Sequence, residues 1–165
     1  MKLENWSIEY INDLVKNANN RNVSKNLRNI FPYPYSVVDA EKFITHCQRC
    51  NNKHINLAII EDDKAIGSVG VSIGEDIYEK SAEIGYWIGE SYWGQGIMTH
   101  AIKEMIELCF SQYDIVRLYA VVFSHNKASC KVLEKCGFVF EGTLKNSIYK
   151  DGNIYDSRIY ALVKK

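Results

Sequence analysis

A Gly-x-Gly turn, Gly94-Gln95-Gly96, joins an apolar segment to an amphipathic one within residues 83–106, EIGYWIGESYWGQGIMTHAIKEMI. We expect a helix directly after the turn, and the first backbone N–H groups of a helix have no intrahelical partners. The helix dipole adds partial positive charge at the same end. Because glycine has no Cβ, a ligand can approach these N–H groups closely. The turn therefore predicts a site for a phosphate or pyrophosphate group.

Two familiar phosphate-binding motifs do not match this turn. A Walker-type loop requires Lys and then Ser or Thr after its last glycine, where this chain has Ile97 and Met98. The dinucleotide fingerprint requires a third glycine, where this chain has Thr99, and an acidic residue at the end of the next strand. That strand is expected to end in Ser-His-Asn at residues 124–126. The sequence thus argues against P-loop and Rossmann proteins.

A short cluster of possible metal ligands, His46, Cys47, Cys50 and His54, precedes the first β-rich segment. Structural zinc sites usually draw on two separated pairs of ligands, whereas these four lie within a single short stretch. A helix through this stretch would bury one thiol and partly expose the other, so we expect no metal. The five cysteines form an odd set at scattered spacing, which predicts reduced thiols rather than a disulfide framework.

The composition is that of an ordinary globular protein, with 47% hydrophobic and 24% charged residues. A length of 165 residues suits one domain, and we expect residues 1–165 to form it, because no linker or repeat divides the chain. The formal net charge of zero gives no sign of a nucleic-acid partner. Apolar runs are too short for a membrane span or a signal peptide, which predicts a cytoplasmic protein with no membrane partner. The Trp and Tyr content would allow a homodimer.

The elements that position the turn can be predicted from periodicity and turn signals. Strand 82–88, helix 97–111 and strand 116–123 form a crossover, which connects parallel strands. Ligands of open α/β sheets bind at the carboxyl ends of such strands, where the Gly turn lies. Two prolines exclude a helix from the loop Phe31–Tyr35. The other predicted elements are strands 2–6, 56–61, 65–73, 148–150 and 154–163 and helices 7–19, 39–51 and 127–136, which give an α/β (α+β) fold with six or seven strands.

Two separated segments of the chain match one family. EIGYWIGESYWGQGIMT (residues 83–99) and NKASCKVLEKCGFVFEG (residues 126–142) resemble the GNAT superfamily of acetyl-CoA-dependent N-acetyltransferases. The resemblance is strongest to the RimJ/RimL-like branch, which acts on N-terminal amines of ribosomal proteins, and it covers residues 57–163 clearly. It implies a mixed, mostly antiparallel sheet of six to seven strands, with a central parallel pair and helices on both faces.

The resemblance implies a site for acetyl-CoA. The Gly loop would bind the pyrophosphate through backbone N–H groups, with donors expected from Gln95, Gly96, Met98 and Thr99. The pantetheine arm would lie beside the end of the central strand, and Asn126 would contact a pantetheine amide, a role compatible with capping a helix. The expected cofactor-binding residues are Trp87, Ile88, Trp93, Gly94, Gln95, Gly96, Ile97, Met98, Thr99, Asn126 and Ser129.

Catalytic roles follow from the same resemblance. Glu83 stands where related enzymes place a carboxylate base, although it could instead pair with a neighbouring lysine or arginine. The Ile88 N–H would stabilise the tetrahedral oxyanion. The Tyr that protonates the leaving thiolate in many GNAT enzymes falls at Leu133, which has no proton to give, so Ser129 is the expected substitute. Expected substrate-binding residues are Phe31, Tyr33, Tyr35 and Glu83.

The sequence therefore predicts transfer of an acetyl group from acetyl-CoA to a primary amine by direct attack in a ternary complex. A protein N-terminal α-amine is the favoured acceptor, because its pKa of about 7.7–8.0 lies far below the roughly 10.4 of a lysine amine. Two alternatives stay open. One is a GNAT enzyme for a small amine such as a polyamine or an aminoglycoside. The other is a catalytically silent, CoA-binding regulatory protein.

Overall fold

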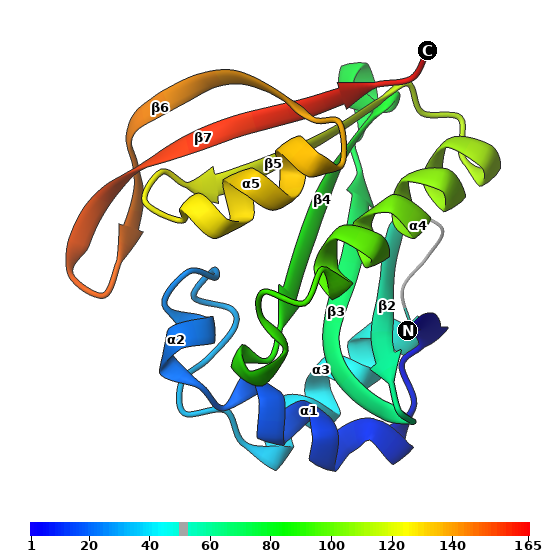
Figure 1. Cartoon of the computed structure of the whole chain (residues 1–165), viewed down its shortest axis with the longest axis vertical. Coiled ribbons are helices and arrows are strands. Elements are labelled where there is room, and N and C mark those ends of the chain that lie inside the picture. Colours follow the sequence, from blue (N-terminus) through cyan, green and yellow to red (C-terminus); the bar gives the residue numbers. More distant parts are fainter. Residues whose placement is uncertain (50–52) are drawn as a thin grey trace.

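The computed structural model describes residues 1–49 and 53–165. Within them a seven-stranded sheet has the order β1-β2-β3-β4-β5-β7-β6 (Figure 1). Neighbouring strands are antiparallel except for β4 and β5, which confirms the predicted mixed sheet with a central parallel pair. The strands are β1 (Lys2–Asn5), β2 (His54–Glu61), β3 (Lys64–Ile73), β4 (Ser81–Ile88), β5 (Arg117–Phe123), β6 (Val139–Lys150) and β7 (Asn153–Val163), and the α-helices are α1 (Ile11–Ala18), α2 (Arg21–Ser24), α3 (Val37–Arg49), α4 (Ile97–Gln112) and α5 (Lys127–Lys135).

Two tight turns set the hairpins of the sheet. Asp62 and Asp63, between β2 and β3, have φ values of 48° and 60°. Asp151 and Gly152, between β6 and β7, have φ values of 51° and 79°. Two-residue loops with positive φ at both positions match the right-handed twist of the strands they join. The chain therefore forms two β-hairpins, β2–β3 and β6–β7.

Helices cover both faces of the sheet, as predicted. Met105 of α4 and Leu133 of α5 lie in one buried cluster with Ile59 of β2. Ile44 of α3 lies in a second cluster with Ala58 of β2. Consecutive strand residues point to opposite faces, so the two clusters are separate cores on the two sides of the sheet. No helix in the described ranges is long and apolar enough to span a membrane.

The sheet opens between β4 and β5. Only three residue pairs join these strands, Ser81↔Arg117, Ala82↔Leu118 and Glu83↔Tyr119. Beyond these pairs β4 continues to Ile88 and β5 to Phe123 without pairing to each other. Figure 1 shows the two strands meeting near their starts and diverging, with α5, β7 and β6 on one side of the opening and β1–β4 on the other.

Three elements differ from the sequence prediction. Helix α3 begins at Val37 rather than Asp39, because the Ser36 hydroxyl accepts from the Asp39 N–H (3.2 Å) and the Asp39 carboxylate accepts from the Ser36 N–H (2.8 Å). Its predicted end at residue 51 lies outside the described residues. Strand β6 begins at Val139, well before the predicted residue 148. Its start was missed because β6 is an edge strand, exposed on most of its length, and lacks the alternation that marks a half-buried strand. The short α2, capped by Asn20, was not predicted.

Candidate active site

The Gly turn leads directly into α4. Gly94 and Gly96 have φ values of 75° and 78°, in the left-handed region that favours glycine. A Cβ added to either residue would meet no atom within 4 Å, so the space in front of the turn is open. Gly96 is the N-cap residue of α4, and no side chain caps this helix.

The backbone N–H groups of residues 95–99 lie in this turn and in the first residues of α4. None of these five groups donates a hydrogen bond to another group in the described part of the chain. A neighbouring helix shows the usual solution, since the side chain of Asn126 caps the start of α5. The start of α4 instead offers a row of unused donors and the positive end of a helix dipole, which suits a phosphate group.

The edge of β4 that faces β5 carries a second set of unused backbone groups. Hydrogen bonds from Gly74 N–H to Ser81 O and from Gly89 N–H to Ile66 O (2.8 Å each) mark the two ends of the β3–β4 ladder. Residues of an antiparallel strand alternate between bonding to that partner and pointing away from it. The backbone groups of the even-numbered residues, including Tyr86 and Ile88, therefore point into the opening.

This alternation places Ile88 and Trp87 differently. The Ile88 N–H points into the opening, as its predicted role requires, while the Ile88 carbonyl accepts from the Trp93 indole N–H (2.9 Å). The backbone groups of Trp87 point to β3 instead, which does not fit the predicted contact with pantetheine. The Trp87 ring packs against Phe31, with ring centroids 5.3 Å apart. Tyr86, which the sequence interpretation left as a strand residue, supplies the neighbouring free backbone groups.

Helix α5 brings two predicted residues to the other side of the opening. The Asn126 side-chain oxygen accepts from the Ser129 N–H (3.2 Å), so Asn126 is the predicted N-cap. The Asn126 side-chain N–H groups make no hydrogen bond within the described residues. The Ser129 hydroxyl lies 2.7 Å from the Tyr86 hydroxyl, which reaches it from β4. Leu133, one turn further along α5, is fully buried.

Glu83 points to the opposite face from Tyr86, as strand alternation predicts. Its carboxylate forms an ion pair with Arg28, in which the side chains of Arg28 and Glu83 are 74% and 25% exposed. The pairing that the sequence left open is thus present. Exposed ion pairs contribute little, about 0–1 kcal/mol, so a substrate can displace this arginine at small cost.

The segment that follows α2 reaches across the opening between β4 and β5. Arg28 pairs with Glu83 on β4, and the Asn26 side-chain oxygen lies 3.0 Å from His125 Nε2, just after β5. On the β4 side, Glu90 accepts from the Asn20 and Asn22 amides at 2.7 and 2.9 Å. These contacts tie α2 and the following residues to both arms of the split sheet.

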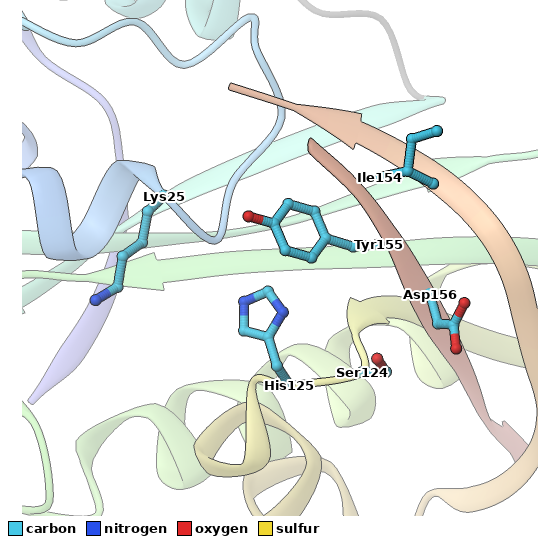
Figure 2. Close-up of a pocket in the computed structure, with 6 residues that line it drawn as sticks. All are labelled: Lys25, Ser124, His125, Ile154, Tyr155 and Asp156. Atoms are coloured by element: carbon cyan, nitrogen blue, oxygen red, sulfur yellow. The ribbon is translucent and has the colours of Figure 1, made fainter. Parts of the chain in front are cut away.

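A cavity of about 620 Å³ lies on the β5 side of this segment (Figure 2). Figure 2 shows the rings of His125 and Tyr155 close to each other, with Lys25 beside them on a separate segment. The His125 and Tyr155 rings are 5.1 Å apart. The same short segment, residues 25–28, therefore contributes both to this cavity and to the environment of Glu83. The lining residues are Lys25, Ser124, His125, Ile154, Tyr155 and Asp156.

The aromatic loop contributes to the site less than predicted. Tyr35 is 4% exposed and belongs to the core under α1 and α3. Burial raises the pKa of its phenol well above the usual range. Its predicted role in substrate binding is therefore wrong, because the core covers its ring. Phe31 packs between Tyr35 and Trp87, and Tyr33 is half exposed beneath the Arg21 guanidinium, 5.6 Å from its ring.

The cysteine-rich stretch shows no metal site within the described residues, where no group of three or more His, Cys, Asp or Glu side chains could hold an ion. Cys50, one of the four ligands considered, lies outside those residues. Cys109, Cys130 and Cys136 are buried thiols. Burial raises the pKa of the Cys109 thiol to about 12, so it stays protonated.

Sequence reasoning missed the residues that act across long sequence distances. Arg28 is 55 positions from Glu83, and Tyr86 is 43 positions from Ser129. Residues 20–30 show no clear periodicity, so nothing marked Arg28 or Lys25. For Tyr86 the sequence did contain a signal. Alternation along the strand places Tyr86 on the opposite face from Glu83, in the core, and a buried tyrosine hydroxyl needs a hydrogen-bond partner there.

Comparisons with known proteins agree with this geometry. Residues 1–139 match the family model described as acetyltransferase (GNAT) domain. The chain is 34% identical over 102 residues to the ribosomal-protein-serine acetyltransferase of Escherichia coli (strain K12), covering 59% of this chain and 56% of that protein. The first curated relatives are matched over 55% to 74% of their own length.

Two solved structures share the whole fold. One is the microcin C7 self-immunity acetyltransferase MccE in complex with acetyl-CoA and AMP, with a TM-score of 0.86, 30% identity and coverage of 98% of this chain and 91% of that one. The other is RimL, a ribosomal L7/L12 α-N-protein acetyltransferase in complex with coenzyme A, with a TM-score of 0.86, 25% identity and coverage of 98% and 93%. The fold, the Gly turn and the split sheet define an acetyltransferase domain. The chain belongs to the GNAT acetyltransferase family, and its relatives include members of the RimJ/RimL-like branch.

Proposed function

We propose that this protein transfers the acetyl group of acetyl-CoA to the α-amine at the N-terminus of a protein, by direct attack in a ternary complex. One observation carries the proposal. The unpaired half of the β4 edge opens next to five unpartnered N–H groups at the start of α4. A ligand that ends in a pyrophosphate and continues as an extended amide chain fits both features.

The cosubstrate would bind along these two surfaces. Its pyrophosphate would accept from the N–H groups of residues 95–99. Its pantetheine arm would lie against β4 like an added strand, with the cleft-facing backbone of Tyr86 and Ile88 as partners. The free amide of Asn126 would contact the arm from the α5 side. The solved complexes of MccE with acetyl-CoA and of RimL with coenzyme A support this choice of cosubstrate.

The chemistry needs a base, a donor for the oxyanion and a donor for the leaving sulfur. Glu83 would accept the proton of the attacking amine once the amine displaces Arg28. The Ile88 N–H would stabilise the oxyanion of the tetrahedral intermediate. The Ser129 hydroxyl would donate to the departing thiolate. A thiolate leaving group with a pKa near about 8.5 needs only weak assistance from such a donor.

The ionisation of amines and the residues around the site both favour a protein N-terminus as acceptor. At pH 7.5 roughly a third of an α-amine is neutral, against roughly 0.1% of a lysine amine. The open cavity beyond residues 25–28 offers room for the residues that follow the amine. A polycationic acceptor would require an acidic pocket, yet the cavity is lined by Lys25 as well as Asp156, and Arg28 pairs with Glu83. The acids Glu75, Asp76 and Glu79 lie before the start of β4, at the opposite end from the Gly turn.

A panel of acceptors tests the proposal directly. The protein is incubated with acetyl-CoA and with peptides that have a free α-amine, the same peptides with a blocked N-terminus and an internal lysine, a polyamine and an aminoglycoside. Mass spectrometry should find one acetyl group on the α-amine of the free peptides. Faster acetylation of a small amine would reassign the acceptor, and acetyl-CoA binding without any transfer would mark a silent binding protein.

Three further expectations accompany this function. Reduced, buried thiols suit a cytoplasmic enzyme. Residues 1–165 act as a single acetyltransferase domain. A homodimer is compatible with the exposed aromatic residues and can be checked by the mass of the protein in solution.

A further inference from the structure

The pair of hydroxyls from Tyr86 and Ser129 lies where the opening between β4 and β5 meets α5. Tyr86 faces the core on the side of α4 and α5, and its ring packs against the buried cluster there. Its hydroxyl lies 2.7 Å from the Ser129 hydroxyl, where either group can donate, and 3.4 Å from the Ser129 carbonyl oxygen, which can only accept. Nothing in the acetyl-transfer chemistry described above uses this phenol.

The direction of the shorter hydrogen bond decides what Ser129 can do. If Ser129 donates to Tyr86, its only proton is used and the leaving sulfur receives none. If Tyr86 donates, the Ser129 proton is free to point into the opening. A phenol is more acidic than an alkyl hydroxyl and is therefore the stronger donor. Burial also raises the pKa of Tyr86 well above its usual range, so the phenol keeps its proton.

We propose that Tyr86 is a positioning residue that donates to the Ser129 oxygen and directs the Ser129 proton at the sulfur of coenzyme A. This inference rests on the proposed function. The amine nitrogen forms a bond to the thioester carbon, its proton passes to Glu83, and the C–S bond breaks with both electrons remaining on sulfur. The resulting thiolate accepts a hydrogen bond from Ser129. Hydrogen bonds in a chain polarise one another, so the Tyr86 donor strengthens the Ser129 donor.

A purely structural role is the competing explanation. A buried tyrosine hydroxyl needs a partner, and Ser129 could serve only to satisfy it. The two explanations differ in what Tyr86→Phe should do. If Ser129 merely satisfies the phenol, removal of the phenol frees Ser129 and leaves the thiolate as well stabilised as before. If Tyr86 orients Ser129, the thiolate loses part of its stabilisation.

The thiol of bound coenzyme A reports on this directly and requires no acceptor. Thiolate absorbance is followed during a pH titration of coenzyme A bound to the wild-type protein, Tyr86→Phe, Ser129→Ala and the double variant. We expect the apparent pKa of the bound thiol to rise by about one to two units in Ser129→Ala, the worth of one hydrogen bond to a charged group, and by a smaller amount in Tyr86→Phe. The double variant should match Ser129→Ala alone, because residues that act through one another are not additive.

Tyr160→Phe is the matched control. Tyr160 is also a buried phenol on this face, and it donates to Glu134 (3.0 Å) rather than to Ser129. Its removal should leave the thiol pKa unchanged. A shift in Ser129→Ala without a shift in Tyr86→Phe would overturn the role of Tyr86 alone. No shift in either variant would overturn the role of Ser129 as well, and failure to bind coenzyme A would overturn the proposed function.

Turnover provides a second readout where an acceptor is found. Tyr86→Phe should lower kcat about 2- to 10-fold and leave the KM for acetyl-CoA unchanged, because the lost hydrogen bond acts only as sulfur departs. A change in KM with kcat intact would instead indicate altered packing of the cosubstrate site and would contradict the proposal.

Discussion

The two edges of β4 have opposite roles. Toward β3 the strand is paired along seven residues, from Ala82 to Ile88. Toward β5 it is paired along three, from Ser81 to Glu83. The same strand thus gives the sheet its continuity on one side and leaves its backbone groups free on the other. The unpaired half of β4 is therefore the half in which hydrogen bonds are left for a ligand to complete.

A binding site that uses this contrast would need few charged side chains. Buried backbone groups are costly when they lack partners, so an open strand edge and an uncapped helix start persist only where water or a ligand can reach them. Both features lie at the carboxyl end of β4, joined by the Gly turn. A ligand that satisfies both at once gains binding energy from groups whose positions are already fixed by the sheet and by α4.

The largest effect should come from Glu83, at the last pair where β4 and β5 still meet. Glu83→Gln keeps the shape of the side chain and removes the base, so kcat for acetylation of a peptide α-amine should fall by about 10²- to 10⁴-fold. Glu79→Gln, an exposed acid before the start of β4, serves as the control and should turn over like the wild type. Equal activity of Glu83→Gln and the wild type in steady-state CoA release would remove Glu83 from the mechanism.

Two valines, one on each strand that flanks β4, test whether the paired β3 side contributes more to stability than the open β5 side. Val69 on β3 is fully buried, whereas Val121 on β5 is 38% exposed beyond the last β4–β5 pair. Val69→Ala should lower the free energy of unfolding by about 2 kcal/mol, from lost burial and the remaining cavity. Val121→Ala should change it by less than about 0.5 kcal/mol. Denaturant unfolding measures both, and comparable losses would mean that the β5 side is packed as tightly as the β3 side.

Much of the fold could be predicted because its signals are local. Neighbouring residues are enough to predict the turns at Asp62-Asp63 and Asp151-Gly152. They are also enough to predict the apolar pattern of β4 and the apolar face of α4. The start of β6 could not be predicted in this way, because most of the strand is exposed and no alternation distinguishes its two faces. Helix α2 is a single short turn whose position depends on contacts with Glu90, 68 to 70 positions away.

The site could be predicted only in part for a related reason. Glycines before a helix indicate a phosphate site from their local sequence alone, and the Gly turn is formed as expected. The environments of Glu83 and Ser129 instead depend on Arg28 and Tyr86, which reach them from other elements. Tyr35 shows the opposite error, since an aromatic residue beside prolines suggests a pocket wall but this ring fills the core.

The Gly turn tests the helix-start half of the site. Gly96→Ala should weaken acetyl-CoA binding about 5- to 30-fold, because a residue with a Cβ pays roughly 1–2 kcal/mol to hold a left-handed conformation and the relaxed loop would misdirect its N–H groups. Gly142→Ala is the control, as Gly142 lies in β6 without a positive φ and with open space for a Cβ. If isothermal titration finds the same affinity for acetyl-CoA in Gly96→Ala and the wild type, the conformation of the turn does not orient these N–H groups toward the ligand.

The smallest effect should come from Arg28, which forms an ion pair with the Glu83 carboxylate in the absence of a substrate. Arg28→Gln removes a largely exposed ion pair, which is worth about 0–1 kcal/mol, so the acceptor no longer has to displace it. We expect the KM for a peptide acceptor to fall by up to about 5-fold with kcat nearly unchanged. Arg49→Gln, an exposed arginine on α3, should leave both constants as they are. A rise in KM for Arg28→Gln would mean that Arg28 binds the acceptor rather than competing with it for Glu83. The segment after α2 would then be part of the acceptor-binding site.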